Sequence, residues 1–120
     1  MKIEIIRDIQ FRSEKKCTPK EIIIHHTWGY SVDRAIKDLK AQGYSTHYII
    51  DRDGTVYQVA LENERMAHCI DHNWCGIGVD IVRGKGQQIL DDQYAALRIL
   101  VKEIAERYGL TLQLHKSGVF

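Results

Sequence analysis

The chain has 120 residues, of which 44% are hydrophobic and 28% are charged, a composition typical of one soluble globular domain spanning residues 1–120. Its 17 lysines and arginines nearly balance its 16 aspartates and glutamates, so we expect no nucleic-acid partner. No stretch is long and apolar enough for membrane insertion, and the first ten residues lack the apolar segment of a secretory signal. We therefore expect synthesis in the cytoplasm without a signal peptide.

The chain has three cysteines, Cys17, Cys69 and Cys75, so at least one of them cannot belong to an intramolecular disulfide. An odd number of cysteines is typical of proteins in a reducing compartment. The count favours three thiols, and the spacing of Cys69 and Cys75 also allows a disulfide between those two.

The first half of the chain predicts a strand, a helix and a hairpin. The segment "EIIIHH" (21–26) is short and β-branched and predicts a strand directed into the core. Ser31 can cap a helix with one apolar face, which Gly43 can end. The segment "STHYIIDRDGTVYQVA" (45–60) predicts a hairpin, because Asp53-Gly54 suits a type I′ turn between two β-rich arms.

The second half predicts a loop, two strands and the longest helix. Residues 66–75 have no clear period and predict a loop, and "GIGVDIV" (76–82) predicts a strand with two alternating faces. A helix is expected over residues 92–108, ended by Gly109, followed by a short strand "LTLQLH" (110–115). This order predicts an α/β fold: a single domain with a mixed central β-sheet flanked by helices.

Two histidines stand where predicted strands end. His25 is close to the end of the first predicted strand and His115 is at the end of the last. Neutral imidazole is a common zinc ligand, and two ligands on separate strands would form a rigid site. The alternative for His25 is a core histidine that is hydrogen-bonded to backbone.

Asp80 interrupts the otherwise apolar strand "GIGVDIV". Burial of a carboxylate without a partner would cost several kcal/mol. Facing a metal or its water, Asp80 could stay ionised and act as a general base. The alternative is an aspartate on an edge strand that faces solvent.

Side chains of the loops are further candidates. Trp28 can form an apolar wall for a ligand or cap the core. His68, in "HCIDHN", can line a cleft or be a solvated loop residue.

Four segments in this order resemble one family. They are "IIIHHTWG", "STHYIIDRDGTVYQV", "AHCIDHNWCGIGVDIVRG" and "QYAALRILVKEIAERYGL". Together they resemble the type 2 N-acetylmuramoyl-L-alanine amidases, a group that includes phage endolysins, bacterial amidases that recycle cell-wall fragments, and animal peptidoglycan-recognition proteins. The resemblance runs from about residue 21 to residue 115, and it implies the same mixed-sheet fold.

The resemblance implies a zinc (Zn²⁺) hydrolase that cuts the amide between N-acetylmuramic acid and L-alanine in peptidoglycan or soluble muropeptides. His25 and His115 fall on the family's zinc-ligand positions, and Asp80 falls on the position of a catalytic glutamate. His68 and Asn73 match a pattern that lines the substrate cleft.

The sequence departs from the family pattern at three points. The family's third zinc ligand follows the second histidine, whereas this sequence stops at "HKSGVF", so the domain is expected to lack the usual C-terminal segment. His26, Cys17, Asp80 and the terminal carboxylate are the remaining candidates for that ligand. Asp80 is one methylene shorter than glutamate. A tyrosine of some endolysins is replaced by Thr46, with Tyr48 two residues further along.

These departures leave two other interpretations beside the enzyme, namely a non-catalytic peptidoglycan-binding domain and a truncated prophage remnant. In each case we expect a monomer that is not inserted in a membrane. The enzyme would act on the cell wall if released, as a phage lysin is, or in the cytoplasm on recycled muropeptides.

Overall fold

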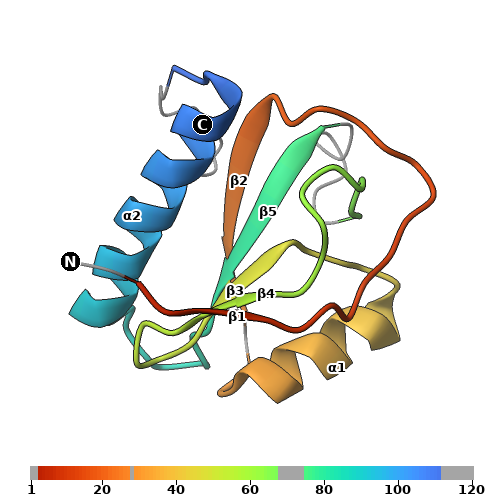
Figure 1. Ribbon diagram of the computed structural model, residues 1–120. Helices are drawn as coiled ribbons and strands as arrows, with labels where there is room; N and C mark the ends of the chain where they lie inside the picture. Colours follow the sequence, from red (N-terminus) through yellow and green to blue (C-terminus); the bar gives the residue numbers. More distant parts are fainter. Residues whose placement is uncertain (1–2, 28, 68–74, 112–120) are drawn as a thin grey trace.

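In the part of the chain that the structure describes, a five-stranded mixed sheet has one helix on each face (Figure 1). The computed structural model describes residues 3–27, 29–67 and 75–111. In chain order the elements are β1 (Ile5–Arg7), β2 (Glu21–His26), α1 (Val32–Gln42), β3 (Tyr48–Ile50), β4 (Val56–Gln58), β5 (Gly76–Ile81) and α2 (Asp91–Tyr108). The α/β fold with a mixed sheet flanked by helices is therefore confirmed.

The strands are arranged in the order β1-β4-β3-β5-β2. The β3–β4 hairpin is antiparallel, whereas β1 runs parallel to β4, and β5 runs parallel to both β3 and β2. The two longest strands, β2 and β5, lie side by side, with His25 in register with Asp80. The predicted strand 21–26 is correct in its bounds but forms one edge of the sheet, although Ile22 and Ile23 are fully buried.

The hairpin is confirmed, but its turn differs from the predicted type I′ turn. Asp51 and Thr55 are joined by a hydrogen bond from the Asp51 N–H to the Thr55 carbonyl, and the Gly54 N–H donates to the Asp51 carbonyl. The loop therefore has three residues, with Gly54 in the left-handed region at φ 87°. This hydrogen-bond pattern is that of a turn followed by a glycine bulge, and it needs positive φ at Gly54.

Both predicted helices begin and end close to the expected residues. The Ser31 side chain accepts a hydrogen bond from the N–H of Arg34, and Gly43 ends α1 in the left-handed conformation. Gly109 ends α2 in the same way. At the start of α2 the buried Gln93 side chain accepts a hydrogen bond from the N–H of Leu90, so a side chain inside the helix replaces a conventional cap.

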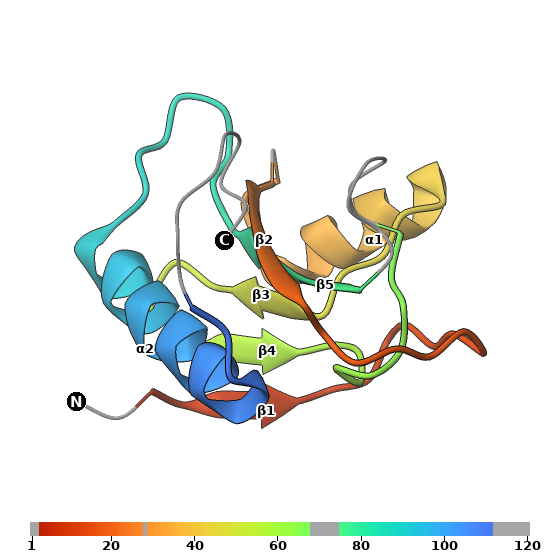
Figure 2. The same cartoon turned by 90° about the horizontal axis from the view of Figure 1, so that it is seen from above.

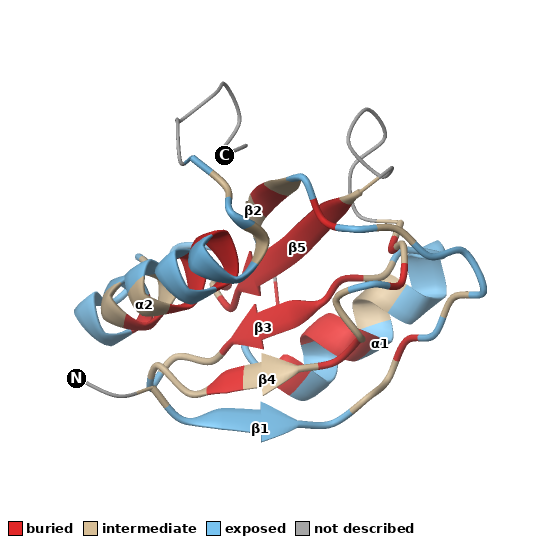
Figure 3. Cartoon of the chain, turned by 45° about the horizontal axis from the view of Figure 1, so that its top comes forward, coloured by how far each residue is buried: buried red, intermediate tan, exposed pale blue. Residues whose placement is uncertain are grey.

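The two helices lie on opposite faces of the sheet, as Figure 2 shows from above, and each covers its own apolar cluster. The segment 76–82 contributes to both clusters: Ile77, Val79 and Ile81 of β5 pack on the α2 side, and Val82, the residue after the strand, packs on the α1 side. All six residues of β5 are buried (Figure 3). The predicted alternation along this strand is therefore confirmed, and it places Asp80 on the α1 side.

Strand β1 is an element that the sequence did not predict. It is three residues long, exposed throughout and located at the edge of the sheet (Figure 3). Its mixture of charged and apolar residues gives no clear period-2 signal over so short a length. Most of the predicted strand 110–115 and most of the predicted loop 66–75 lie outside the described residues. No described helix has the length and hydropathy needed to cross a membrane.

Candidate active site

A cleft of about 210 Å³ opens between α1 and the carboxyl ends of β2 and β5. Parallel strands present their carboxyl ends at the same edge of a sheet, which is where α/β folds commonly bind ligands. The cleft is lined from the sheet side by His25, His26, Thr27 and Asp80, and from the α1 side by Ala35, Asp38, Leu39, Gln42 and Tyr44.

His25 and Asp80 lie side by side at this cleft. They are register partners on the adjacent parallel strands β2 and β5, and residues in register on neighbouring strands point to the same face. The pairing of β2 with β5 thus holds two residues from distant parts of the sequence next to each other. The structure brings together the predicted metal ligand and the predicted catalytic carboxylate.

Asp80 is buried, with 5% of its surface exposed, and burial raises the pKa of its carboxyl group to about 7. The Thr46 hydroxyl donates a hydrogen bond of 3.3 Å to Oδ1 of Asp80, which opposes part of that rise in pKa. The interpretation as a solvent-facing aspartate on an edge strand is wrong, because β5 lies between β3 and β2. A carboxyl group with this pKa can accept and return a proton near neutral pH.

His25 is half-buried and its imidazole is held in the neutral form. Burial lowers the pKa of His25, and the neighbouring His26 lowers it further. A metal binds the unprotonated nitrogen of imidazole, so a lowered pKa prepares this side chain to act as a ligand near neutral pH. The donor type and its position beside a carboxylate therefore fit one ligand of a zinc site.

Two candidates for a third zinc ligand, His26 and Cys17, differ in how close they lie to His25. His26, at the exposed end of β2, borders the same cleft as His25, although alternation along the strand places the two side chains on opposite faces. Cys17 lies beside Cys75, at the amino end of β5, roughly five strand residues or about 16 Å from Asp80. Cys17 is therefore too distant to join His25. Among residues 3–27, 29–67 and 75–111, no group of three His, Cys, Asp or Glu side chains is arranged to hold a metal ion.

Four of the predicted site residues lie outside the described part of the chain. They are the second metal ligand His115 and the substrate-binding candidates Trp28, His68 and Asn73. The terminal carboxylate lies outside it as well. These assignments remain predictions.

The residues of α1 that line the cleft, here called the α1 wall, were not predicted from the sequence. Ala35, Leu39 and Gln42 recur at helical spacing, with Asp38 beside them, so they share one face of α1. The polar residues within this partly apolar face were the signal that could have identified a cleft. Asp38 is held by an ion pair with Arg34 at 3.1 Å.

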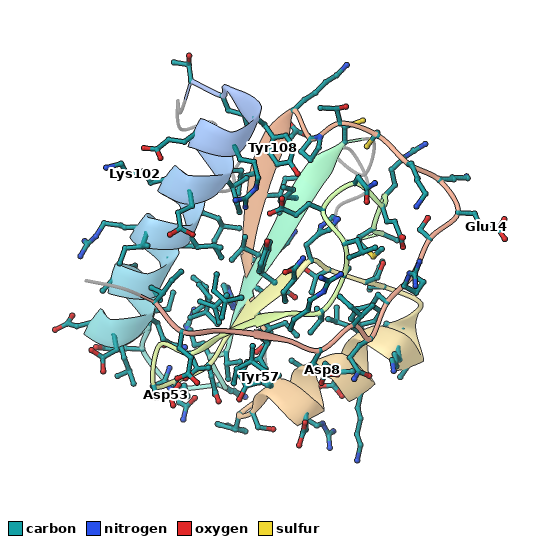
Figure 4. All side chains as sticks on the ribbon, viewed as in Figure 1. Asp8, Glu14, Asp53, Tyr57, Lys102 and Tyr108 are labelled. Atoms are coloured by element: carbon teal, nitrogen blue, oxygen red, sulfur yellow. The ribbon has the colours of Figure 1, made fainter. Side chains whose placement is uncertain are left out.

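Tyr48 does not replace the tyrosine that some endolysins have at position 46. Its side chain packs in the α2 cluster, where its hydroxyl donates a 2.5 Å hydrogen bond to Glu62. Glu62 also accepts a hydrogen bond of 2.7 Å from Tyr108, which is labelled at the end of α2 in Figure 4. Thr46, in contrast, contacts Asp80 on the α1 face.

Comparison with known proteins identifies the family. A model of the N-acetylmuramoyl-L-alanine amidase family matches residues 15–118, and the chain therefore belongs to this family. No curated protein sequence matches the chain significantly.

Several solved structures share the fold. N-acetylmuramoyl-L-alanine amidase LysC from Clostridium intestinale URNW is 21% identical with a TM-score of 0.74, over 92% of this chain and 80% of that chain. The Ph2119 endolysin from Thermus scotoductus MAT2119 bacteriophage Ph2119 is 22% identical with a TM-score of 0.70, over 89% and 83% of the two chains. Drosophila Peptidoglycan Recognition Protein (PGRP)-SA is 16% identical with a TM-score of 0.70, over 91% and 76%. At these identities the likeness establishes the fold.

Proposed function

We propose that the protein hydrolyses the amide between N-acetylmuramic acid and L-alanine in peptidoglycan. The observation that carries this proposal is the placement of His25 beside the buried Asp80 in one cleft. Membership of the amidase family supports this choice of substrate and of the bond that is cut.

In this proposal His25 and His115 hold a zinc ion at the carboxyl end of β2. A bound zinc ion supplies Lewis acidity at the scissile carbonyl group. Asp80 accepts the proton of the attacking water and returns it to the leaving amine of L-alanine, which its pKa of about 7 allows. Thr46 orients the carboxylate through its hydrogen bond to Oδ1. The α1 wall, with Asp38 and Gln42, borders the substrate.

The test combines metal content with product chemistry. Cleavage of this amide creates a new amino-terminal alanine on the stem peptide and no new reducing sugar end. We expect purified peptidoglycan treated with the protein to gain amino-terminal alanine, detected by dinitrophenylation. We expect elemental analysis to give close to one zinc per chain, lost in His25→Ala and in His115→Ala.

Asp80→Asn keeps the size of the side chain and removes the proton acceptor. We expect it to lower the rate about 100-fold or more while leaving the zinc content unchanged. Asp53→Asn, in the hairpin turn away from the cleft, is the matched control and should retain full activity. Release of alanine at an unchanged rate by Asp80→Asn would contradict the assigned role.

Binding of peptidoglycan without hydrolysis is the second candidate function. It is supported by the shared fold with Peptidoglycan Recognition Protein (PGRP)-SA. Binding to insoluble peptidoglycan without release of alanine, and without added zinc, would favour this function over the amidase.

A further inference from the structure

Cys17 and Cys75 lie together although they are distant in the sequence. The segment that carries Cys17 runs into β2, whose first residue Glu21 is in register with Gly76, the residue after Cys75, and the Cys75 thiol is close enough to raise the pKa of Cys17. The backbone fixes both residues: the N–H of Cys17 donates to the Asn63 carbonyl at 2.9 Å, and the N–H of Lys20 donates to the Cys75 carbonyl at 2.8 Å. Neighbouring thiols on backbone held in this way are candidates for a disulfide, which requires proximity of the two cysteines without large backbone movement.

The environment of this thiol pair fits slow but selective oxidation. Both cysteines are half-buried and are not joined by a disulfide. Burial, and after it the neighbouring Cys75 thiol, raise the pKa of Cys17 to about 11, so its thiolate is scarce at neutral pH. Lys20 and Arg65 are close enough to act in the opposite direction, and these two cations also favour the approach of an anionic oxidant.

We propose that Cys17 and Cys75 form a reversible disulfide when the protein meets a small anionic disulfide such as oxidised glutathione. The Cys75 thiolate attacks the oxidant to give a mixed disulfide and releases one glutathione. Cys17 then loses its proton and attacks the Cys75 sulfur, which releases the second glutathione. The protein gives up two protons and two electrons, and the oxidant becomes two molecules of glutathione.

The bond would join the segment between β1 and β2 to the residue that precedes β5. A crosslink between positions so distant in the sequence restricts the unfolded chain strongly, and it is expected to stabilise the fold. A protein that passes from a reducing to an oxidising compartment would thereby gain stability. This inference does not depend on the proposed amidase activity.

The experiment uses the full chain with Cys69→Ser, because Cys69 and Cys75 fall on the same tryptic peptide (66–83), whereas Cys17 falls on 17–20. After incubation with oxidised glutathione at pH 8, remaining thiols are alkylated and the digest is analysed by mass spectrometry without reduction. We expect a linked 17–20/66–83 peptide. We also expect a Tm about 5–15 °C above that of the reduced protein, reversed by dithiothreitol.

Cys17→Ser in the same background is the matched control, and its Tm should not rise with oxidant. Treatment of the chain with all three cysteines tests the competing pair. A disulfide between Cys69 and Cys75 as the main product there, or only glutathione adducts in Cys69→Ser, would overturn the proposal.

Discussion

Thr46 donates a 3.3 Å hydrogen bond from its hydroxyl group to Oδ1 of Asp80, and both side chains are buried. The partner of the carboxylate is thus a neutral hydroxyl group. A neutral donor orients the carboxylate and opposes only part of the effect of burial, so the pKa of Asp80 stays close to 7. This contact makes Thr46 a positioning residue for the proposed reaction.

Replacement of this hydroxyl group should change the pH dependence of the activity. Thr46→Val keeps the shape of the side chain but removes the hydrogen bond that lowers the pKa of Asp80. We expect kcat to fall about tenfold and the acidic limb of the kcat/KM profile to move to higher pH, because the base stays protonated longer. Thr46→Ser retains the hydroxyl donor, so its kcat and its pH profile should be close to those of the parent protein. Equal profiles for the Val and Ser variants would show that the hydroxyl group does not act on Asp80.

We assign His47 a role in the stability of the fold next to the site and no role in the proposed reaction. The N–H of Gly78 donates to Nδ1 of His47 at 3.0 Å, so Nε2 carries the proton and donates to the Glu64 carbonyl at 2.7 Å. Burial lowers the pKa of His47, in keeping with a neutral ring. We expect His47→Leu to reduce the free energy of unfolding by about 2–4 kcal/mol, because two buried backbone groups lose their partner. Urea denaturation measures this loss, and His26→Leu at an exposed position should change it by less than about 0.5 kcal/mol.

Glu64 makes the stability of the fold depend on pH in the acidic range. Its buried carboxylate accepts hydrogen bonds from Arg12 and the Ser13 N–H and pairs with Lys16 at 3.3 Å. These contacts lower the pKa of Glu64 to about 2, and the hydrogen bond with Arg12 has the largest effect. The unfolded value is about 4.3, so the stabilisation is complete above that pH and is lost as the pH falls towards 2.

Glu64→Gln should therefore be less stable than the parent protein at pH 7, and the difference should shrink as the pH falls from 4.5 to 2.5. Urea unfolding between pH 7 and pH 2.5 tests this convergence. A difference between the proteins that stays constant over the whole range would mean that ionisation of Glu64 is not the source of the stability.

The sequence predicted the elements whose signals are local. The β-branched run before His25, the alternation around Asp80 and the glycines that end both helices each specify a structure within a few residues. The placement of His25 and Asp80 in one site was predicted only through the family resemblance. Their register depends on pairing between two strands that are distant in the sequence, which no local pattern encodes.

Other features depended on tertiary contacts and could not be predicted in this way. Strand β1 is defined by its pairing with β4 and buries none of its three residues. The proximity of Cys17 and Cys75 joins two segments with no shared pattern, whereas the sequence favoured three thiols and allowed, on spacing, only the pair Cys69 and Cys75. The cap of α2 comes from Gln93 inside the helix, whereas sequence rules place a cap before it.

Gly54, in the hairpin turn, lies against the first turn of α2. Its replacement should lower the stability of the fold for two reasons that can be separated. Its φ of 87° lies in the left-handed region, and a Cβ atom there would lie 2.9 Å from the Asp92 carbonyl oxygen. Gly86 has a similar φ of 81°, but a Cβ atom would meet nothing within 4 Å. Gly86→Ala therefore reports the backbone cost alone, about 1 kcal/mol, whereas Gly54→Ala adds a collision with backbone.

We expect Gly54→Ala to lower the free energy of unfolding by about 2–3 kcal/mol, clearly more than Gly86→Ala. Urea denaturation of the two variants beside the parent protein measures both values. Because the collision would push the hairpin turn away from the first turn of α2, hydrogen exchange at the amino end of that helix should also accelerate in Gly54→Ala alone. Equal losses of stability in the two variants would mean that the turn does not press against Asp92.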